Sequence, residues 1–337
     1  MTDDGVTDDG VTDDSVTDDG VTLAWGIAGT GRIARDVGRI LAAEATVVAV
    51  GSRDAARAQA LASELGAGAA HASYDALVAD PAVQAVYVAT PHTGHAEVAA
   101  AALRAGKAVL CEKPMTAQLA ETEALVALAA ETGCFLMEAV WMRFNPLVQQ
   151  LARLVDEGAL GEVRSLRASL GFAAAYDPAG RLWDPALGGG ALLDIGLYVV
   201  DLARLLLGDP TEVVARGSLA PTGVDAECTL ALSWPSGARG LLDCSLTTDL
   251  PGTAVVVGSR GWASIGPSFH APTLLRVSTG SDLVEHENPS RQAGFVGEVR
   301  EVARCVAARR AQSDVMPLAE SVATARVLQD ARAQLGP

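Results

Sequence analysis

Short apolar segments alternate with amphipathic ones along the part of the chain that follows residue 22. The apolar segments span residues 23–29, 46–52, 84–90, 108–113 and 134–140. They are rich in valine or aromatic residues, which is typical of strands that are covered on both faces. The stretches between them have helical spacing, with Asp54 at one start and Gly66, Gly106 and Gly133 at the ends. This alternation predicts a doubly wound parallel sheet.

The pattern changes after Trp141. Strand-like segments with alternating or mixed polarity then span residues 162–172, 211–220, 227–234, 239–248, 253–259, 262–266 and 274–279. Helices are expected at residues 146–158, 196–207, 296–310 and 318–335. Because the later strands follow one another without helices, their sheet should be largely antiparallel. The pattern therefore predicts two α/β domains, at residues 22–141 and 142–337.

Composition narrows the class of protein. The length of 337 residues suits two domains of ordinary size. No apolar run is long enough to span a bilayer and no signal peptide opens the chain, so we expect a soluble, cytoplasmic protein without a membrane partner. The net charge of −16 disfavours a nucleic-acid partner. The five cysteines lack the spacing of a disulfide framework or a metal site, so we expect no metal.

A tandem repeat, VTDDG, fills residues 1–21. Its eight aspartates account for half of the net charge of −16. Such a short, charged repeat without bulky apolar residues cannot offset the entropy lost on ordering, so we expect a disordered tail. Calcium binding by the paired aspartates is the alternative interpretation.

A glycine pattern, Gly29-x-Gly31-x-x-Ala34, follows the first apolar segment and opens a helical one. The glycines would allow a tight turn and close approach of a pyrophosphate, while Ala34 would let helix and strand pack. A glycine-rich turn without function is the alternative, but the strand-to-helix setting favours a dinucleotide site. The turn residues expected to contact the cofactor are Gly29, Thr30, Gly31, Arg32 and Ile33.

The end of the second apolar segment indicates which nicotinamide cofactor binds. An acidic residue there would bond the ribose 2′-hydroxyl of NAD, but this chain has Gly51, Ser52 and Arg53. A hydroxyl and a guanidinium suit a 2′-phosphate, so NADP is predicted, with NAD still possible. Arg53 as an exposed residue at a helix start is the alternative, and Asp54 is better explained as the helix cap.

Polar residues follow two further strands at the edge where such sheets bind ligands. Thr90, Pro91 and His95 follow one, and we expect them to contact the cofactor, although capping or packing explains His95 equally well. Glu112 and Lys113 end the other strand, and we expect both to contact the cofactor, with Lys113 near the carbon at which a nicotinamide-dependent reaction would occur.

Asp194 and Tyr198 form a second candidate cluster, after a run of three glycines. Their i, i+4 spacing puts a carboxylate and a phenol on one helix face. A tyrosine beside a lysine can move a proton, because the ammonium favours the phenolate. The alternative is that Asp194 caps the helix and Tyr198 belongs to the core.

Several motifs together resemble one family, that of glucose-fructose oxidoreductase, inositol dehydrogenase and rhizopine catabolism proteins (Gfo/Idh/MocA). In chain order they are WGIAGTGRIA, SRD, VATPHTGHAE, VLCEKPMT, FLMEAVWMRFNP and GGGALLDIGLY. The likeness covers residues 23–336. The motifs are most similar to the branch of dimeric dihydrodiol dehydrogenases and NADP-dependent D-xylose dehydrogenases.

The resemblance implies an N-terminal Rossmann domain, and a C-terminal α/β domain whose large, mostly antiparallel open sheet often forms a dimer interface, so a homodimer is expected. It implies that Lys113 contacts substrate and nicotinamide, with a cis peptide before Pro114, and that Asp194 and Tyr198 belong to the D-x-G-x-Y motif. By position alone, Trp141, Arg143 and Phe172 are candidate substrate residues.

These observations lead us to expect an NADP-dependent dehydrogenase that acts on a hydroxyl of a sugar or dihydrodiol. Tyr198 would take the hydroxyl proton, Lys113 would favour its ionised form and bind the substrate oxygen, and Asp194 would orient the substrate. The division of proton transfer between Lys113 and Tyr198 stays open. An imine, enone or keto-sugar reductase is the alternative enzyme. A nucleotide sensor without catalysis is disfavoured, because it needs no proton-transfer residues.

Overall fold

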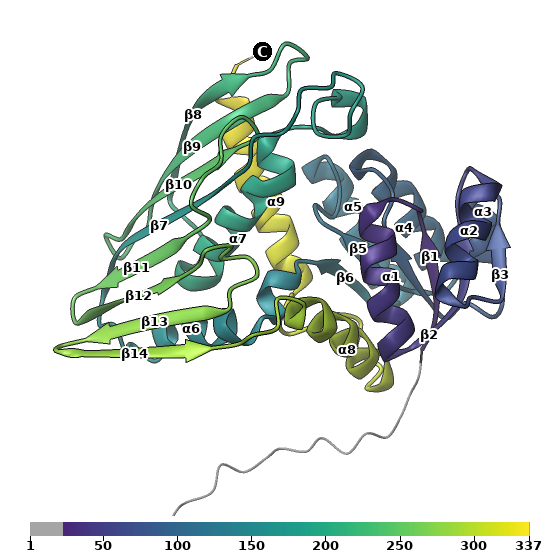
Figure 1. Cartoon of the computed structure of the whole chain (residues 1–337), viewed down its shortest axis with the longest axis horizontal. Helices are drawn as coiled ribbons and strands as arrows, with labels where there is room; N and C mark the ends of the chain where they lie inside the picture. The colour runs from purple at the N-terminus through teal and green to yellow at the C-terminus, as the bar shows by residue number, and fades with distance from the viewer. Residues whose placement is uncertain (1–22, 337) are drawn as a thin grey trace, which may run out of the picture.

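The computed structural model describes residues 23–336 as two sheets with helices between them (Figure 1). The prediction for residues 1–21 lies outside this range. Helix α9 (Leu318–Ala333) packs on helix α5 (Leu119–Thr132) of the first half and on α7 (Leu197–Leu207) of the second. Within residues 23–336, no helix has both the length and the hydropathy that a membrane crossing requires.

The first sheet is parallel, in the strand order β3-β2-β1-β4-β5-β6. Its strands are β1 (Ala24–Ala28), β2 (Thr46–Gly51), β3 (Ala69–His71), β4 (Ala85–Val88), β5 (Ala108–Glu112) and β6 (Leu136–Ala139). The order reverses between β1 and β4, and ligands bind at such a reversal, outside the carboxyl ends of the strands. Five of the six strands were predicted. The missed strand, β3, has three half-buried residues and no apolar run.

Helices cover this sheet on both faces. They are α1 (Arg32–Glu44), α2 (Ala55–Leu65), α3 (Tyr74–Ala79), α4 (His95–Arg104) and α5. Asp54 caps α2 as predicted, because its carboxylate accepts a hydrogen bond of 3.1 Å from the Arg57 amide. Gly66 ends α2 and Gly133 ends α5 in the left-handed region, with φ of 71° and 67°.

The second sheet is mostly antiparallel, in the order β14-β13-β12-β11-β7-β10-β9-β8. Its strands are β7 (Val163–Gly171), β8 (Glu212–Leu219), β9 (Asp225–Ser233), β10 (Arg239–Ser245), β11 (Ala254–Gly258), β12 (Gly261–Ile265), β13 (Leu274–Thr279) and β14 (Asp282–Glu287). Only the β7–β10 pair among them is parallel. The predicted fold class, a Rossmann-type parallel sheet plus an α/β half with a large antiparallel sheet, is confirmed.

Helices cover one face of the second sheet, and its other face carries none in Figure 1. The remaining helices of this half are α6 (Pro146–Asp156) and α8 (Ala293–Ala307). Short helical turns shape the region between the sheets: η1 (His92–Gly94), η2 (Trp141–Phe144), η3 (Pro185–Leu187) and η4 (Leu192–Gly196). The η4 turn is π-helical and runs directly into α7.

Candidate active site

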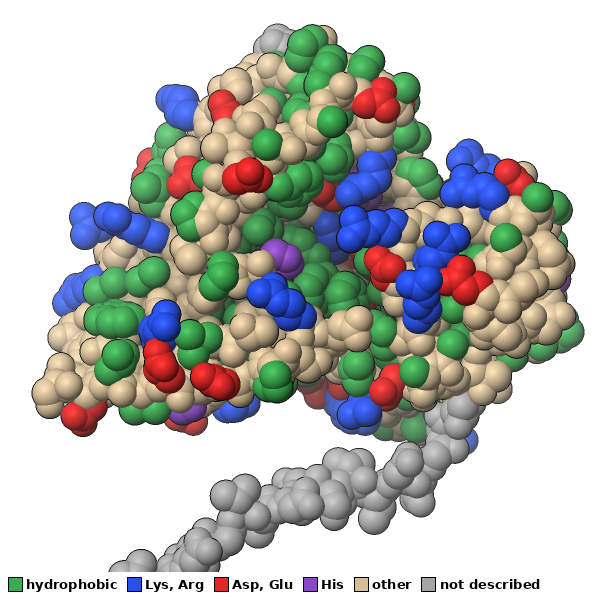
Figure 2. All heavy atoms as spheres, viewed as in Figure 1, with side chains coloured by type: hydrophobic (Ala, Val, Ile, Leu, Met, Phe, Trp, Pro, Cys, Tyr) green, Lys and Arg blue, Asp and Glu red, His purple; other side chains and the backbone are tan. Residues whose placement is uncertain are grey.

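A cleft of about 780 Å³ lies between the two halves, within the size range of small-molecule sites. Figure 2 shows this hollow, with basic side chains gathered on one rim. The cleft brings together almost all of the residues expected from the sequence. Those that line it are Gly29, Thr30, Gly31, Arg32, Ile33, Ser52, Arg53, Thr90, Pro91, His95, Glu112, Lys113, Trp141, Phe172, Asp194 and Tyr198.

The turn between β1 and α1 has the shape that a pyrophosphate needs. Gly29 has a φ of 125°, and a Cβ there would lie 2.4 Å from the Ala89 carbonyl oxygen, so only glycine fits. At Gly31, by contrast, a Cβ would meet nothing within 4 Å. Open space therefore faces the first amides of α1, where anions bind favourably. The residues present fit a dinucleotide in this part of the cleft.

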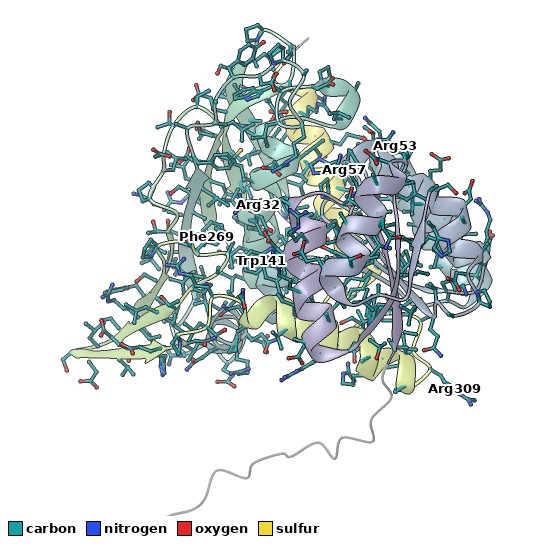
Figure 3. All side chains as sticks on the ribbon, turned by 45° about the vertical axis from the view of Figure 1, so that its right-hand side comes forward. Arg32, Arg53, Arg57, Trp141, Phe269 and Arg309 are labelled. Carbon is teal, nitrogen blue, oxygen red and sulfur yellow. The ribbon has the colours of Figure 1, made fainter. Side chains whose placement is uncertain are left out.

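Three guanidinium groups lie near the amino ends of α1 and α2, at the same rim: Arg32, Arg53 and Arg57 (Figure 3). Arg57 donates a hydrogen bond of 3.2 Å to the carbonyl oxygen of Thr30, which brings it against the phosphate turn. Arg57 was not predicted as a site residue, although its position in the first turn of α2, four residues after Arg53, was a usable signal. The cluster can meet a doubly charged phosphate.

Lys113 follows β5 and points across the cleft to the second half. Its Nζ donates to the carbonyl oxygen of Asp194 at 2.5 Å and lies 3.5 Å from Oδ1 of the same residue. It also lies 4.9 Å from the ring centroid of Tyr198. The peptide bond between Lys113 and Pro114 is cis. The expected trio of Lys113, Asp194 and Tyr198 therefore forms one cluster.

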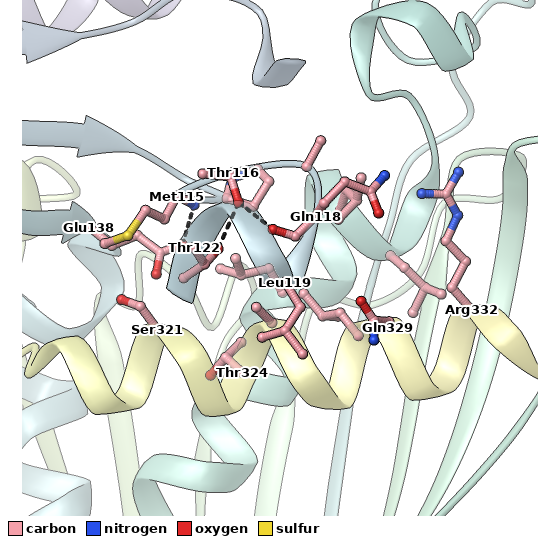
Figure 4. A pocket seen from close by; sticks show the side chains of 17 residues that line it. Met115, Thr116, Gln118, Leu119, Thr122, Glu138, Ser321, Thr324, Gln329 and Arg332 are labelled. Atoms are coloured by element: carbon pink, nitrogen blue, oxygen red, sulfur yellow. Dashed lines mark hydrogen bonds between the residues drawn. The ribbon is translucent and has the colours of Figure 1, made fainter. Parts of the chain in front are cut away.

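Buried polar side chains fix the turn that follows Lys113 (Figure 4). Glu138 on β6 accepts a hydrogen bond of 2.7 Å from the Met115 amide. The Thr116 hydroxyl lies 2.7 Å from that of Thr122 and donates to the Gln118 carbonyl at 2.7 Å. Complete burial raises the pKa of Glu138 to about 7. These contacts fix the backbone at Met115 and Thr116, directly after Lys113 and Pro114.

His95 reaches the edge of the cleft but is only 1% exposed. Its Nδ1 lies 2.8 Å from the Pro114 carbonyl oxygen and its Nε2 lies 2.9 Å from that of Thr90. Both ring nitrogens thus face protein carbonyls. His95 ties the loop after β4 to the turn after Lys113, which favours the packing interpretation.

The neighbouring His92 joins the two halves at the rim of the cleft. Burial lowers its pKa to about 3, so the ring is neutral and its Nδ1 donates to the Gly188 carbonyl at 2.9 Å. Thr93 donates to the Ala186 carbonyl at 3.0 Å. A Cβ at Gly188 would lie 2.8 Å from the His92 Cβ, so this close approach requires glycine.

Asp194 stands on the η4 turn, one turn before Tyr198 on α7. The start of η4 is fixed from β9, because the Asp225 carboxylate accepts from the Leu192 amide at 2.5 Å. Burial would raise the pKa of Asp194, but the positive charges of Lys113 and Arg181 outweigh it and lower the pKa to about 2. Asp194 is therefore a charged partner of Lys113. Arg181, 2.9 Å away, was not singled out from the sequence.

Tyr198 differs from the expectation in its protonation. Complete burial raises its pKa well above the ordinary value, and the charge of Glu112 adds to this. The Lys113 ammonium lies over the Tyr198 ring and bonds to Asp194 rather than to the phenol oxygen. The burial of Tyr198 thus favours the neutral phenol and opposes the phenolate that Lys113 was expected to favour, so the proton-transfer role of Tyr198 stays a prediction. Its oxygen accepts a 2.6 Å hydrogen bond from Trp141 Nε1.

Aromatic rings line the inner end of the cleft. Trp141 stacks on Phe295, with ring centroids 4.1 Å apart and planes at 14°. Phe172 is 38% exposed and faces the same space. His270 contacts Trp141 edge-on. Phe295 and His270 come from the C-terminal half in segments without a motif, so the sequence analysis missed both.

Arg143 is a correction to the expected set of substrate residues. It does not line the cleft and is 3% exposed. Its guanidinium forms ion pairs of 2.8 Å with Asp201 on α7 and with Glu320 on α9. Arg143 therefore joins η2 to α7 and α9 in the core instead of lining the cleft.

Comparison with known proteins places these features among oxidoreductases. Residues 23–140 match a family profile described as "Oxidoreductase family, NAD-binding Rossmann fold". Residues 148–264 match the GFO/IDH/MocA C-terminal domain.

Individual relatives span nearly the whole chain. The trans-1,2-dihydrobenzene-1,2-diol dehydrogenase of Mus musculus is 38% identical over 93% of this chain and 97% of its own length. That of Homo sapiens is 36% identical over the same shares. The crystal structure of an aldose-aldose oxidoreductase from Caulobacter crescentus, complexed with glycerol, has a TM-score of 0.85 at 27% identity, with 93% and 97% of the chains covered. A 3-ketoreductase from Actinomadura kijaniata, in complex with NADP and TDP-benzene, has a TM-score of 0.83 at 30% identity, with 93% and 98% covered.

Proposed function

The chain belongs to the Gfo/Idh/MocA family of oxidoreductases, and on that premise we propose that it uses NADP to interconvert a hydroxyl and a carbonyl group of a sugar or dihydrodiol. The observation that carries the proposal is the meeting of Lys113, Asp194 and Tyr198 at the inner end of a cleft whose outer end fits a dinucleotide. The names of the relatives support a diol or sugar as substrate.

NADP is proposed over NAD because of the charge at the outer end of the cleft. Arg32, Arg53 and Arg57 line this end, and Ser52 adds a hydroxyl that is 3.5 Å from that of Thr30. Arginine forks match phosphate oxygens in geometry and charge. The bound nicotinamide supplies the chemistry of hydride transfer. The 3-ketoreductase crystallised with NADP is a relative consistent with this choice.

The proton is exchanged at the substrate oxygen by Lys113 in this proposal. In the reducing direction the ammonium gives a proton to the carbonyl oxygen, and in the oxidising direction the neutral amine takes the hydroxyl proton. Asp194 holds the ammonium in position through its carbonyl oxygen and its charged carboxylate. This assignment differs from the expectation that Tyr198 is the proton acceptor, because burial raises the pKa of Tyr198 and a neutral phenol has little basicity.

Tyr198 has a different part in the proposal. Its oxygen already accepts from the Trp141 indole, so its own hydroxyl proton is left to donate. A neutral phenol that donates to the substrate oxygen stabilises the negative charge that develops there. Trp141, Phe172 and Phe295 offer apolar surface to the carbon face of a cyclic substrate.

A panel of sugars and diols tests the activity. The full-length protein is mixed with NADP or NAD and each substrate, and reduced cofactor is followed by absorbance. We expect turnover of at least one cyclic sugar or diol, faster with NADP. Keto-sugars with NADPH test the reverse direction. No reaction with any CH–OH or keto substrate, together with reduction of imines or enones, would refute the proposal.

A homodimer through the helix-free face of the second sheet is part of the proposal. Exposed apolar side chains on this face come from five strands: Val214, Leu241, Val257, Trp262 and Leu283. The strand register pairs Val257 directly with Trp262. Leu283 lies opposite Ser278, which in turn lies opposite Trp262. Val257, Trp262 and Leu283 therefore form an apolar row that Ser278 interrupts, while Val214 and Leu241 lie in the adjacent row, which also contains Arg167. Exposed apolar side chains on an open sheet face are typical of an interface between subunits.

A further inference from the structure

His270 lies on the loop between β12 and β13, at the inner end of the cleft. We infer that His270 binds a second substrate hydroxyl, next to the hydroxyl that reacts at Lys113 and Tyr198, so that the enzyme selects vicinal diols. The inference rests on the proposed function and deepens it. Neither the motifs nor the comparisons assign a role to this residue.

The loop that carries His270 is firmly anchored. The side chain of Phe269 is fully buried, and its amide donates to the Gly252 carbonyl at 2.8 Å. On the other side, the Asn145 amide donates to the Pro272 carbonyl at 3.3 Å. Ser268 holds a left-handed φ of 61°, a conformation that non-glycine residues adopt rarely and often at functional sites. The imidazole is therefore held in a fixed position at the cleft wall.

Two residues of the proposed site contact the His270 ring. Its centroid lies 5.3 Å from that of Tyr198 and 5.5 Å from that of Trp141. Side chains in such contact reach oxygens on neighbouring carbons of one substrate. When Tyr198 binds the reacting oxygen, the adjacent oxygen comes within reach of His270.

The two ring nitrogens of His270 have different surroundings. Nδ1 is buried and has no hydrogen-bond partner among residues 23–336, while the partly exposed ring lines the cleft with its remaining edge. A buried N–H without an acceptor is rarer in proteins than an unpaired acceptor. The proton is therefore expected on Nε2, where it can donate into the cleft.

The charge of His270 determines which ligand group it suits. Burial, with the nearby positive charges of Lys113 and Arg291, lowers its pKa to about 4, so the ring is neutral at physiological pH. A neutral single donor suits a hydroxyl oxygen better than a carboxylate or a phosphate, which charged groups bind more strongly.

The test uses matched substrates and variants of the full-length protein. The substrate pairs are trans-cyclohexane-1,2-diol with cyclohexanol, and D-glucose with 2-deoxy-D-glucose, each with NADP. His270→Phe keeps an aromatic ring without a donor, and His270→Gln returns an N–H near the Nε2 position. His286→Phe, on β14, is the matched control, because His286 does not line the cleft.

We expect His270→Phe to lower kcat/KM about 5–50-fold for trans-cyclohexane-1,2-diol and D-glucose, which have the second hydroxyl. For cyclohexanol and 2-deoxy-D-glucose, which lack it, kcat/KM should stay within about twofold, because no hydrogen bond is lost. His270→Gln should recover most of the loss. The dissociation constant of NADPH and the His286→Phe rates should not change. An equal loss for both members of a pair, or no loss for either, would overturn the inference while the activity itself stands.

A separate measurement distinguishes failure of the inference from failure of the proposed function. If the wild-type protein turns over neither pair, calorimetric titration of trans-cyclohexane-1,2-diol into the NADPH-loaded protein still tests His270. A weaker dissociation constant in His270→Phe, recovered in His270→Gln, supports the diol site. Equal constants in all three proteins overturn it.

Discussion

The indole N–H of Trp141 donates a 2.6 Å hydrogen bond to the phenol oxygen of Tyr198. The two residues come from opposite halves of the site, η2 after the parallel sheet and α7 of the second half. The bond occupies one lone pair of the phenol and directs its hydroxyl proton elsewhere. The hydroxyl proton of Tyr198 is therefore free to be donated to a substrate oxygen, while the assignment of proton exchange to Lys113 rests on the raised pKa of the phenol.

Substitutions of Lys113 and Tyr198 should therefore differ in severity. Lys113→Met removes the proton-exchanging group and should lower kcat by about 10²–10⁴. Tyr198→Phe removes one hydrogen bond to the substrate oxygen and should cost about 1–3 kcal/mol of transition-state stabilisation. Steady-state kinetics with the best substrate of the panel measures both. NADP binding, followed by cofactor fluorescence, should survive in each variant. A Tyr198→Phe enzyme as impaired as Lys113→Met would return proton transfer to the phenol.

The arginine cluster should determine the preference for NADP. Arg57→Ala and Arg53→Ala should each weaken NADP binding by about 1–3 kcal/mol, the value of a charged hydrogen bond, and change NAD binding little. Arg39→Ala is the control, because Arg39 pairs with Glu64 and does not line the cleft. Calorimetric titration with both cofactors measures the effect. Equal losses for NADP and NAD would argue against a 2′-phosphate site.

Glu138 should make stability depend on pH. Its folded-state pKa of about 7 lies above the ordinary value of 4.5, so the folded protein binds this proton more tightly than the unfolded chain does. The contribution of Glu138 to the free energy of unfolding is fully present below pH 4.5 and is lost as the pH rises to about 7. The loss amounts to about 3 kcal/mol at 1.36 kcal/mol per pKa unit.

Glu138→Gln isolates this effect, because an amide can still accept from Met115 without titrating. We expect the difference in unfolding free energy between Glu138→Gln and wild type, measured by urea denaturation, to shift in favour of the variant from pH 4.5 to 7. Glu131→Gln, exposed on α5, is the control and should leave the pH profile unchanged. A constant difference for Glu138→Gln across this range would mean that the carboxyl titrates normally.

Substitutions on the helix-free face of the second sheet should disrupt the proposed dimer, while substitutions on its other face should not. Trp262→Glu buries a charge in the apolar row and should convert the dimer to monomer. Val284→Glu is the matched control, because Val284 is also exposed but points to the opposite face of β14 from Leu283. Sedimentation velocity gives the mass of each variant. A wild-type protein that sediments as a monomer would remove the interface, and dissociation by both variants would show that the apolar row is not its cause.

Local patterns predicted most of the fold. Continuous apolar runs identified five strands of the first sheet, since strands covered on both faces carry that signal. They missed β3 and β14, because β3 is only three residues long and β14 is largely exposed and charged. A signal that depends on burial is absent where the strand is not buried.

Most residues of the candidate site that lie in sequence motifs were predicted, and most of those outside the motifs were not. Lys113, Asp194 and Tyr198 meet as expected, yet the pKa of Tyr198 depends on burial and on Glu112, which no local pattern reveals. Arg143 is the opposite case, a residue that was predicted to contact substrate but lies in the core. It stands two residues after Trp141, but the short η2 turn points it into the core, where Asp201 and Glu320 pair with it. The cleft is also lined by residues outside the motifs, whose place there depends on tertiary structure: Arg181, His270 and Phe295.

The shortest contact of Lys113 is to the main-chain carbonyl of Asp194, at 2.5 Å, rather than to its side chain. A substitution at position 194 changes the carboxylate but leaves a carbonyl in place. Natural or engineered variation at this position can therefore retune the charge beside the lysine without releasing the lysine from its place. The main-chain carbonyl thus gives Lys113 one hydrogen bond that does not depend on the side chain at position 194.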